Sequence, residues 1–275
     1  MRFLFVSFLF FCSILSAQIT CTPEDKSLFR SKMTELSQMD LNNTPNNIIA
    51  IGQTFLKTQY VEKTLEIGEK ETLVINLRGL DCTTFVENVL AFSLLLKDTI
   101  QDFNAFANII KTIRYRDGIL ESYSSRLHYF TEWIRNNNEK GLVQDITPEL
   151  GGKEVEKPIN FMGTHRDLYP FLSDESNYQE ILDAERELAK EPICVLPQNE
   201  INSQEHNIKD GDIIALATSI KGLDVTHTGF AITINERIHL LHASISGEVK
   251  ITEKPLIDYL KKIKSNTGII VARPL

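Results

Sequence analysis

The stretch Leu80-Asp81-Cys82-Thr83-Thr84-Phe85-Val86-Glu87 combines a helix-capping residue, a cysteine and the start of an apolar helical pattern. Apolar residues follow the cysteine at helical spacing as far as Leu94, which predicts a helix with one buried face. Asp81 is suited to cap this helix, which places Cys82 in its first turn. There the helix dipole and free backbone N–H groups favour thiolate over thiol, so we expect a nucleophile. The alternative is a small buried hydrophobe.

The composition of the chain is that of a soluble globular protein. Its 275 residues suffice for one large domain or two small ones, and 42% are hydrophobic and 24% charged. The formal net charge is −8 and no basic stripe stands out. We therefore expect no nucleic acid partner.

The first residues have the pattern of an export signal. Arg2 gives a positive start, 3–15 is a short apolar run, and Ser16-Ala17 offers small residues for cleavage. The sequence thus predicts a signal peptide at 1–17, a mature domain at 18–275, and a periplasmic or cell-envelope location. No later segment is long and apolar enough to cross a bilayer, so we expect no stable membrane span.

The cysteines support an unpaired thiol in the mature protein. Cleavage of the signal would remove Cys12 and leave Cys21, Cys82 and Cys194. An odd number in an exported protein leaves at least one thiol unpaired. The simplest interpretation is that Cys82 is free, while Cys21 and Cys194 are either paired or both buried. The sequence does not choose between these alternatives.

The pattern along the chain places helices first and strands last. We expect helices over most of 22–58 with a break at 42–47, then from Cys82, at 103–113 and at 178–190, an extended segment at 60–77, an irregular segment at 135–165, and strands at 211–216, 226–234, 238–244 and 269–272. This order predicts an α+β domain with helices packed on an antiparallel sheet.

Two histidines on adjacent predicted strands are candidates to act on the thiol. Alternation puts His227 on one strand face with Gly229 and Ala231, and such small residues let a helix end approach closely. The hairpin at 235–237 can then set His242 beside His227.

In this arrangement His227 would be the base for Cys82. His242 would fix its tautomer and ring orientation, a role for which His239 and Ser244 are weaker candidates.

Four segments in this order resemble the NlpC-type superfamily of cell-wall cysteine peptidases, whose pattern is Asp-Cys-Ser-Gly-Phe, Gly-Asp, His-x-Gly and His-Ala. They are Asp81-Cys82-Thr83-Thr84-Phe85-Val86, Asp210-Gly211-Asp212-Ile213-Ile214, His227-Thr228-Gly229-Phe230-Ala231-Ile232 and Leu241-His242-Ala243-Ser244. The chain departs from the pattern at Thr83-Thr84. That departure, together with residues 114–118, 125–130 and 161–165, resembles the N-acetylmuramoyl-L-alanine amidase-like branch.

The resemblance implies a papain-like fold with Cys82 as nucleophile, His227 as base and His242 as orienting residue. Tyr60 matches a tyrosine that the superfamily places near the forming oxyanion, although its gap to Cys82 is longer than usual. Relatives use the residue at Asp81 against the amine end of a peptide. The branch implies hydrolysis of the amide between N-acetylmuramic acid and L-alanine in peptidoglycan or its fragments, with no cofactor, no metal and a monomeric enzyme.

An insert at about 98–205 is expected to shape the substrate cleft. Arg126 is a candidate to hold a peptide carboxylate, Tyr129 and Trp133 to stack on sugars, and His128 and His165 to line the cleft. The alternative for the aromatic residues is a structural cluster beneath a loop.

Three other functions compete with this hypothesis. The same machinery can cut between D-glutamate and the diamino acid of the stem peptide. A zinc amidase using His227 and His242 is disfavoured, because the chain has no His-Glu-x-x-His motif and no close cluster of Cys and His ligands. A degenerate site would leave an inactive module that binds the cell wall.

Overall fold

The computed structural model describes residues 19–39 and 47–275. The predicted signal peptide at 1–17 and Cys12 lie outside the described residues, as does most of the predicted break at 42–47. Across the described parts of the chain, no helix combines the length and the apolar character needed to cross a bilayer.

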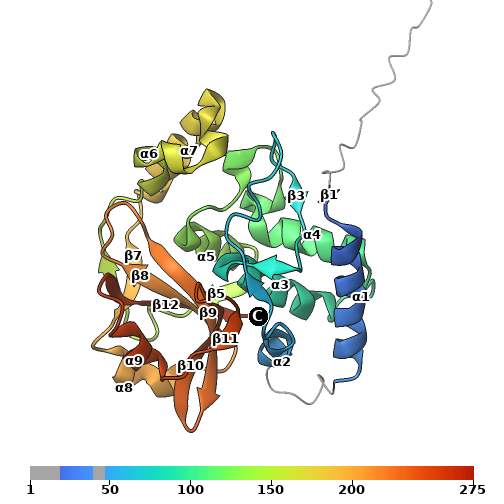
Figure 1. Cartoon of the computed structure of the whole chain (residues 1–275). Coiled ribbons are helices and arrows are strands. Elements are labelled where there is room, and N and C mark those ends of the chain that lie inside the picture. Colours follow the sequence, from blue (N-terminus) through green and yellow to red (C-terminus); the bar gives the residue numbers. More distant parts are fainter. Residues whose placement is uncertain (1–18, 40–46) are drawn as a thin grey trace, which may run out of the picture.

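An antiparallel sheet forms one side of the molecule (Figure 1). Seven of its strands lie in the spatial order β11-β10-β9-β8-β12-β7-β6, and β5 pairs with the last part of β12. The strands are β5 (Val143–Asp145), β6 (Lys153–Val155), β7 (Ile193–Pro197), β8 (Ile213–Thr218), β9 (Val225–Ile234), β10 (Arg237–Ala243), β11 (Val249–Ile251) and β12 (Asn266–Pro274). The predicted α+β class with an antiparallel sheet is confirmed.

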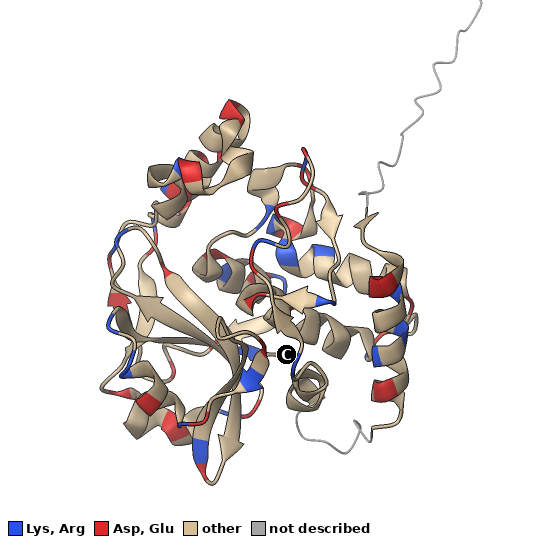
Figure 2. Ribbon diagram, in the orientation of Figure 1, with Lys and Arg blue, Asp and Glu red and all other residues tan. Residues whose placement is uncertain are grey.

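Helices lie on both faces of the sheet, and most of them form the other side of the molecule (Figure 1). They are α1 (Pro23–Ser37), α2 (Asn47–Gln53), α3 (Cys82–Leu95), α4 (Phe103–Arg114), α5 (Phe130–Glu139), α6 (Phe161–Thr164), α7 (Glu175–Leu188), α8 (Ile201–Gln204) and α9 (Leu256–Leu260). Two small parallel sheets join β1 (Ile19–Thr20) to β3 (Leu73–Val74) and β2 (Gln59–Tyr60) to β4 (Gly79–Leu80). Acidic and basic residues are interspersed over these outer elements (Figure 2).

Helix α3 lies in the middle of the molecule, between the sheet and the outer helices (Figure 1). It is apolar nearly all round, as expected of a helix buried on every side. Phe85 meets Phe230 of β9 edge to face at 5.7 Å, and Phe92 packs on Phe106 of α4 at 4.5 Å. Because both sides of α3 are packed, the position of its first turn relative to the sheet is fixed.

Asp81 caps α3, as the sequence predicts. Its Oδ1 accepts a hydrogen bond from the backbone N–H of Thr84 at 2.7 Å, and Thr84 Oγ1 accepts one from the Asp81 N–H at 2.9 Å. This reciprocal pair satisfies two backbone donors at the helix start. A cap of this kind is worth about 1 kcal/mol, and it defines where Cys82 lies.

The hairpin between β9 and β10 sets the positions of the two histidines. Asn235 and Glu236 have φ values of 49° and 64°, which is the left-handed pair that a type I′ turn requires. A Cβ on Gly229 would lie 2.6 Å from the Leu241 carbonyl oxygen and 2.8 Å from His242 Cβ. Only glycine allows the two strands to approach so closely there.

The segment 135–165 is not irregular, contrary to the prediction. It holds the end of α5, strands β5 and β6, and all of α6. Strands β5, β6 and β7, which lie within the region 98–205, belong to the main sheet, and α6 and α7 project from the molecule (Figure 1). The strands were missed because they are short and β6 is exposed throughout, which removes the apolar alternation.

Candidate active site

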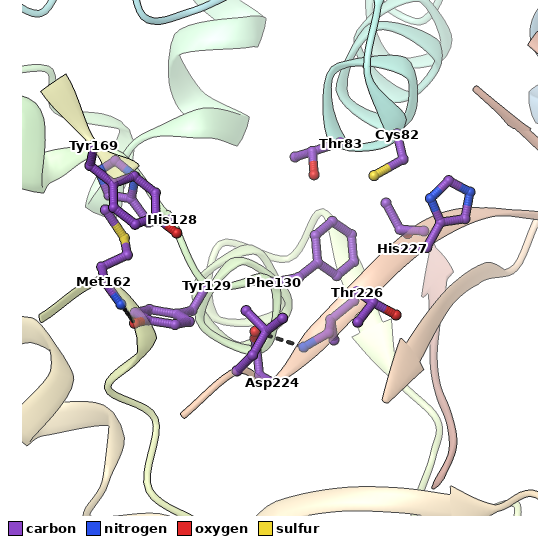
Figure 3. Close-up of a pocket in the computed structure, with 13 residues that line it drawn as sticks. Cys82, Thr83, His128, Tyr129, Phe130, Met162, Tyr169, Asp224, Thr226 and His227 are labelled. Atoms are coloured by element: carbon purple, nitrogen blue, oxygen red, sulfur yellow. Dashed lines mark hydrogen bonds between the residues drawn. The ribbon is translucent and has the colours of Figure 1, made fainter. Parts of the chain in front are cut away.

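Cys82 begins α3 and opens onto a pocket (Figure 3). The thiol is partly exposed, so it is neither sealed in the core nor on the open surface. The wall is built from three other regions of the chain: 128–130 at the start of α5, Met162 and Tyr169 in and after α6, and 223–228 leading into β9. Figure 3 shows these side chains around the space next to the sulfur.

His227 lines the same pocket as Cys82, which is the juxtaposition that the sequence predicts. Its Nε2 lies 2.5 Å from Nδ1 of His242, and the two rings meet nearly perpendicular at 4.8 Å. If Nε2 of His227 donates in this bond, its Nδ1 carries no proton. The geometry then leaves Nδ1 as the nitrogen that can accept a proton from a thiol.

The resting Cys82–His227 pair is neutral, which corrects the expectation of a stabilised thiolate. Burial, and next the charge of Asp81, raise the pKa of Cys82 to about 12, although hydrogen bonds from Thr228 and Thr83 act in the opposite direction. Burial lowers the pKa of His227 to about 4. Loss of hydration therefore outweighs the hydrogen bonds that favour the thiolate at this position.

The pKa of His242 is also low, at about 3, because of burial first and then the charges of His227 and Lys250. Its Nε2 is buried and has no hydrogen-bond partner among the described residues. Since both imidazoles are neutral at pH 7, His242 offers His227 an acceptor and no competing positive charge.

The pairing of β2 with β4 places Tyr60 beside the segment that leads into Cys82. Tyr60 pairs with Leu80, two residues before Cys82. Burial first, then the charges of Cys82, Asp81 and Glu62, raise the pKa of Tyr60 to about 12, so its hydroxyl keeps its proton. The phenol is therefore available as a hydrogen-bond donor near the sulfur.

Tyr259 in α9 contacts the ring of His242, and no motif in the sequence predicts this contact. Its ring meets the ring of His242 edge to face at 5.7 Å and 71°. Burial, and then the charge of Cys82, raise its pKa. The helix that carries it has only five residues and follows Pro255, so its apolar periodicity is too short to detect.

Two of the predicted cleft residues line the pocket. His128 and Tyr129 do so, although the Tyr129 hydroxyl is already engaged: it donates to Glu185 at 2.7 Å and accepts from the Met162 N–H at 2.9 Å. Trp133 is fully buried against Phe130, with ring centroids 4.9 Å apart, so it has no face open to a sugar.

The other predicted binding residues are not part of the pocket wall. Arg126 is buried, with Nη2 at 2.6 Å from Glu66 and Nε at 3.3 Å from Glu71, so its charge is used inside the protein. His165 is exposed and stacks on Phe161 at 4.0 Å. Asp81 serves as the helix cap.

Cys21 and Cys194 are unpaired and partly exposed, as is Cys82. Neither alternative left open by the sequence, a disulfide between them or burial of both, describes these two thiols. Within residues 19–39 and 47–275, no group of three or more His, Cys, Asp or Glu side chains is arranged to bind a metal ion.

The chain is similar to solved structures over most of its length. A Bacteroides uniformis N-acetylmuramoyl-L-alanine amidase has 37% sequence identity and a TM-score of 0.79, over 83% of this chain and 97% of that one. A Bacteroides fragilis protein, described provisionally as a xylanase, has 39% identity and a TM-score of 0.77, over 81% of this chain and 98% of that one. A Legionella pneumophila protein of family DUF1460 shares the fold at 22% identity and a TM-score of 0.64, over 92% of this chain and 93% of that one.

A search among curated proteins gave no match. The model of the family described as N-acetylmuramoyl-L-alanine amidase-like matches residues 50–269, a range that includes Tyr60, Cys82, His227, His242 and Tyr259. The chain therefore belongs to the N-acetylmuramoyl-L-alanine amidase-like family.

Proposed function

We propose that the protein is a cysteine amidase that hydrolyses the amide between N-acetylmuramic acid and L-alanine in peptidoglycan or its fragments. Family membership and the similarity to the Bacteroides uniformis amidase support an amidase acting on the cell wall. The observation that carries the cysteine mechanism is the position of Cys82 and His227 on one pocket wall, with His227 bonded to His242. On the same grounds we propose that the fold is papain-like and of the NlpC type.

In the first step, Cys82 Sγ attacks the lactyl carbonyl carbon while its proton passes to Nδ1 of His227. Because the resting pair is neutral, the proton leaves sulfur as the S–C bond forms rather than before substrate binds. The negative charge that develops on the carbonyl oxygen is stabilised by the Cys82 backbone N–H and the Tyr60 hydroxyl.

In the second step, protonated His227 returns the proton to the L-alanine nitrogen and the C–N bond breaks. During this step His242 accepts the Nε2–H bond of His227 and stabilises its transient positive charge. A water molecule, deprotonated by His227, then attacks the thioester. The products are a free lactyl carboxylate, a peptide with a free amine and the regenerated thiol.

The pocket does not resemble a glycosidase site, despite the provisional description of the Bacteroides fragilis relative. Hydrolysis of a glycoside usually needs two carboxyl groups that flank the bond. Among the described residues, Asp224 is the one carboxylate in the pocket wall, and it already accepts bonds from Thr131 and Val225. An amide substrate fits the thiol–imidazole pair better.

We further propose that residues 1–17 direct export to the periplasm or cell envelope, where peptidoglycan lies. We also propose that the region 98–205 shapes the cleft, because His128, Tyr129, Phe130, Met162 and Tyr169 from it line the pocket.

Mass spectrometry of digests of defined muropeptides tests the reaction. We expect a disaccharide with a free lactyl carboxylate and a peptide that begins with L-alanine. Cys82→Ala and Cys82→Ser should abolish both products, whereas His206→Phe, at an exposed position outside the pocket, should not.

Full activity in either Cys82 variant would end the cysteine mechanism. Cleavage after D-glutamate would establish the endopeptidase alternative. Binding of uncut muropeptide by the wild type would indicate an inactive module.

A further inference from the structure

His128 presents a fixed hydrogen-bond acceptor at the pocket wall. Its Nε2 lies 2.8 Å from the carbonyl oxygen of Tyr123, so that nitrogen must carry the proton and donate. Loss of hydration, then the charge of Arg126 and, more weakly, that of Arg116, hold the pKa of His128 well below its usual range. The ring is therefore neutral, and its Nδ1 can only accept.

This acceptor is open to the pocket. His128 is partly exposed and lines the space beside Cys82. Among the described residues Nδ1 has no hydrogen-bond partner, and it is not one of the buried polar atoms sealed from solvent. A ligand in the pocket can therefore donate a hydrogen bond to it.

The rest of the wall disfavours a negatively charged group. None of the described lysines and arginines lines the pocket, and the nearby Arg126 is held behind the wall by Glu66 and Glu71. Asp224 contributes a carboxylate whose oxygens accept bonds from Thr131 and Val225. A substrate carboxylate placed here would lose hydration and find neither a cation nor a donor at His128.

We propose that this pocket is a subsite for an uncharged secondary amide of the substrate, whose N–H donates to Nδ1 of His128, and that the carboxylates of the stem peptide lie outside it. The inference rests on the proposed amidase function. The pocket volume of about 150 Å³ is small beside the roughly 300–1,000 Å³ of sites for drug-sized ligands. It therefore takes one group of the substrate, not the disaccharide.

Two amides of the proposed substrate lie close to the bond that is cut. One is the acetamido group of the muramic acid ring, and the other is the amide between L-alanine and D-glutamate. Both are neutral and carry one N–H. N-methylation of either one removes the donor without adding charge, so it distinguishes the two sources.

A cycle of enzyme and substrate changes tests the contact. The parent muropeptide and its two N-methylated forms are compared as substrates of wild type and His128→Phe, which keeps an aromatic ring but has no acceptor. In wild type we expect one methylated form to lose about 10-fold in kcat/KM, the scale of one hydrogen bond. In His128→Phe that penalty should shrink at least about threefold, and the form affected identifies the amide.

His128→Asn places a carbonyl oxygen near the position of Nδ1, so it should restore the penalty, while His206→Phe should behave as wild type. Equal penalties in wild type and His128→Phe would overturn the proposal. If wild type does not cut the parent at the lactyl–alanine bond, the proposed function fails instead.

A measurement that needs no change at His128 guards against misfolding of the variants. In Cys82→Ala, the ¹⁵N resonance of His128 Nδ1 should move when the parent substrate is added. It should stay in place with the methylated form that lost activity. Parent binding without any change of this resonance would contradict the contact.

Discussion

At the scale of single residues, two opposing sets of interactions act on the pKa of Cys82 at the start of α3. The hydrogen bonds from Thr83 and Thr228 favour thiolate, whereas burial and the charge of Asp81 favour thiol, and burial and Asp81 dominate. In the proposed mechanism, the proton of Cys82 is therefore removed only as the substrate is attacked. In this respect the Cys82–His227 pair works like a serine–histidine pair, with the base acting in the transition state.

The Tyr60 hydroxyl gives the first prediction. Tyr60→Phe should lower kcat roughly 100- to 1,000-fold with a smaller change in KM, because it removes a donor to the developing oxyanion. Steady-state kinetics on the parent muropeptide measure this. Tyr178→Phe, which removes a hydroxyl bonded to the Gly163 carbonyl outside the pocket, is the control. An unchanged kcat in Tyr60→Phe would remove Tyr60 from the oxyanion site.

Which site residues could be predicted depends on how local their signals are. Asp81 and Cys82 are recognisable from a cap followed by a helical pattern. The prediction that the small residues beside His227 admit the helix end is wrong, because α3 packs through Phe85 on Phe230, on the face of β9 opposite to Ala231. The environment of Arg126 could not be predicted in this way. Its guanidinium is paired with Glu66, which lies 60 residues earlier in the chain. No feature of the sequence shows that this charge is neutralised inside the protein.

At the scale of elements, His227 and His242 differ in how their rings are held in place. His227 is bonded to His242, but Nε2 of His242 has no partner among the described residues. What packs on the His242 ring is Tyr259 of α9. We infer that this short helix orients His242 by packing where a hydrogen bond is missing, which makes Tyr259 a positioning residue.

The second prediction separates the ring of Tyr259 from its hydroxyl. Tyr259→Phe keeps the edge-to-face contact and should keep most of the activity, whereas Tyr259→Leu should lower kcat. In Tyr259→Leu water can reach His242, which faces His227, Lys250 and the Cys82 region. Because burial is the main cause of the low pKa values of His227 and His242, these values should rise toward their ordinary values. The acid limb of the kcat/KM profile should then move to higher pH, as a pH series on the parent substrate would show.

A loss of stability alone would lower activity at every pH without moving the limb. Identical profiles for wild type and Tyr259→Leu would therefore exclude the positioning role. Asp258→Asn, on the same helix and paired with Lys261, controls for general effects on α9.

At the scale of the whole molecule, the spatial order of the strands could not be predicted from the sequence. β8, β9 and β10 follow one another both in the chain and in the sheet, and the predicted bounds agree with theirs to within two residues. β12 comes last in the chain but lies between β8 and β7 and also pairs with β5. Hydrophobic patterning can identify such a strand but does not show which strands pair with it. The sequence therefore predicts an insert at 98–205, although β5, β6 and β7 within this region belong to the main sheet.

The third prediction concerns acid stability and follows from holding neutral histidines inside this fold. An unfolded chain binds a proton at each histidine near pH 6.5, whereas His242 has a folded pKa of about 3. Between these values the unfolded state binds more protons, so the contribution to the free energy of unfolding is complete above pH 6.5 and falls as the pH is lowered. Replacing His242 by Asn removes this titration. The difference in unfolding free energy, wild type minus His242→Asn, should therefore drop by about 1–2 kcal/mol from pH 7.5 to pH 5.

Urea unfolding at both pH values measures that difference. Buried carboxyl groups such as Glu71 and Glu87 have raised pKa values, which change the unfolding free energy with pH in the opposite direction. Because both proteins contain these groups, their contribution cancels in the difference. His206→Asn, at an exposed position, controls for the substitution itself. Parallel curves for wild type and His242→Asn would mean that His242 is hydrated or already charged at pH 5. It would then be a competing cation beside His227 rather than a neutral acceptor, and the second step of the mechanism would need another group to stabilise the imidazolium.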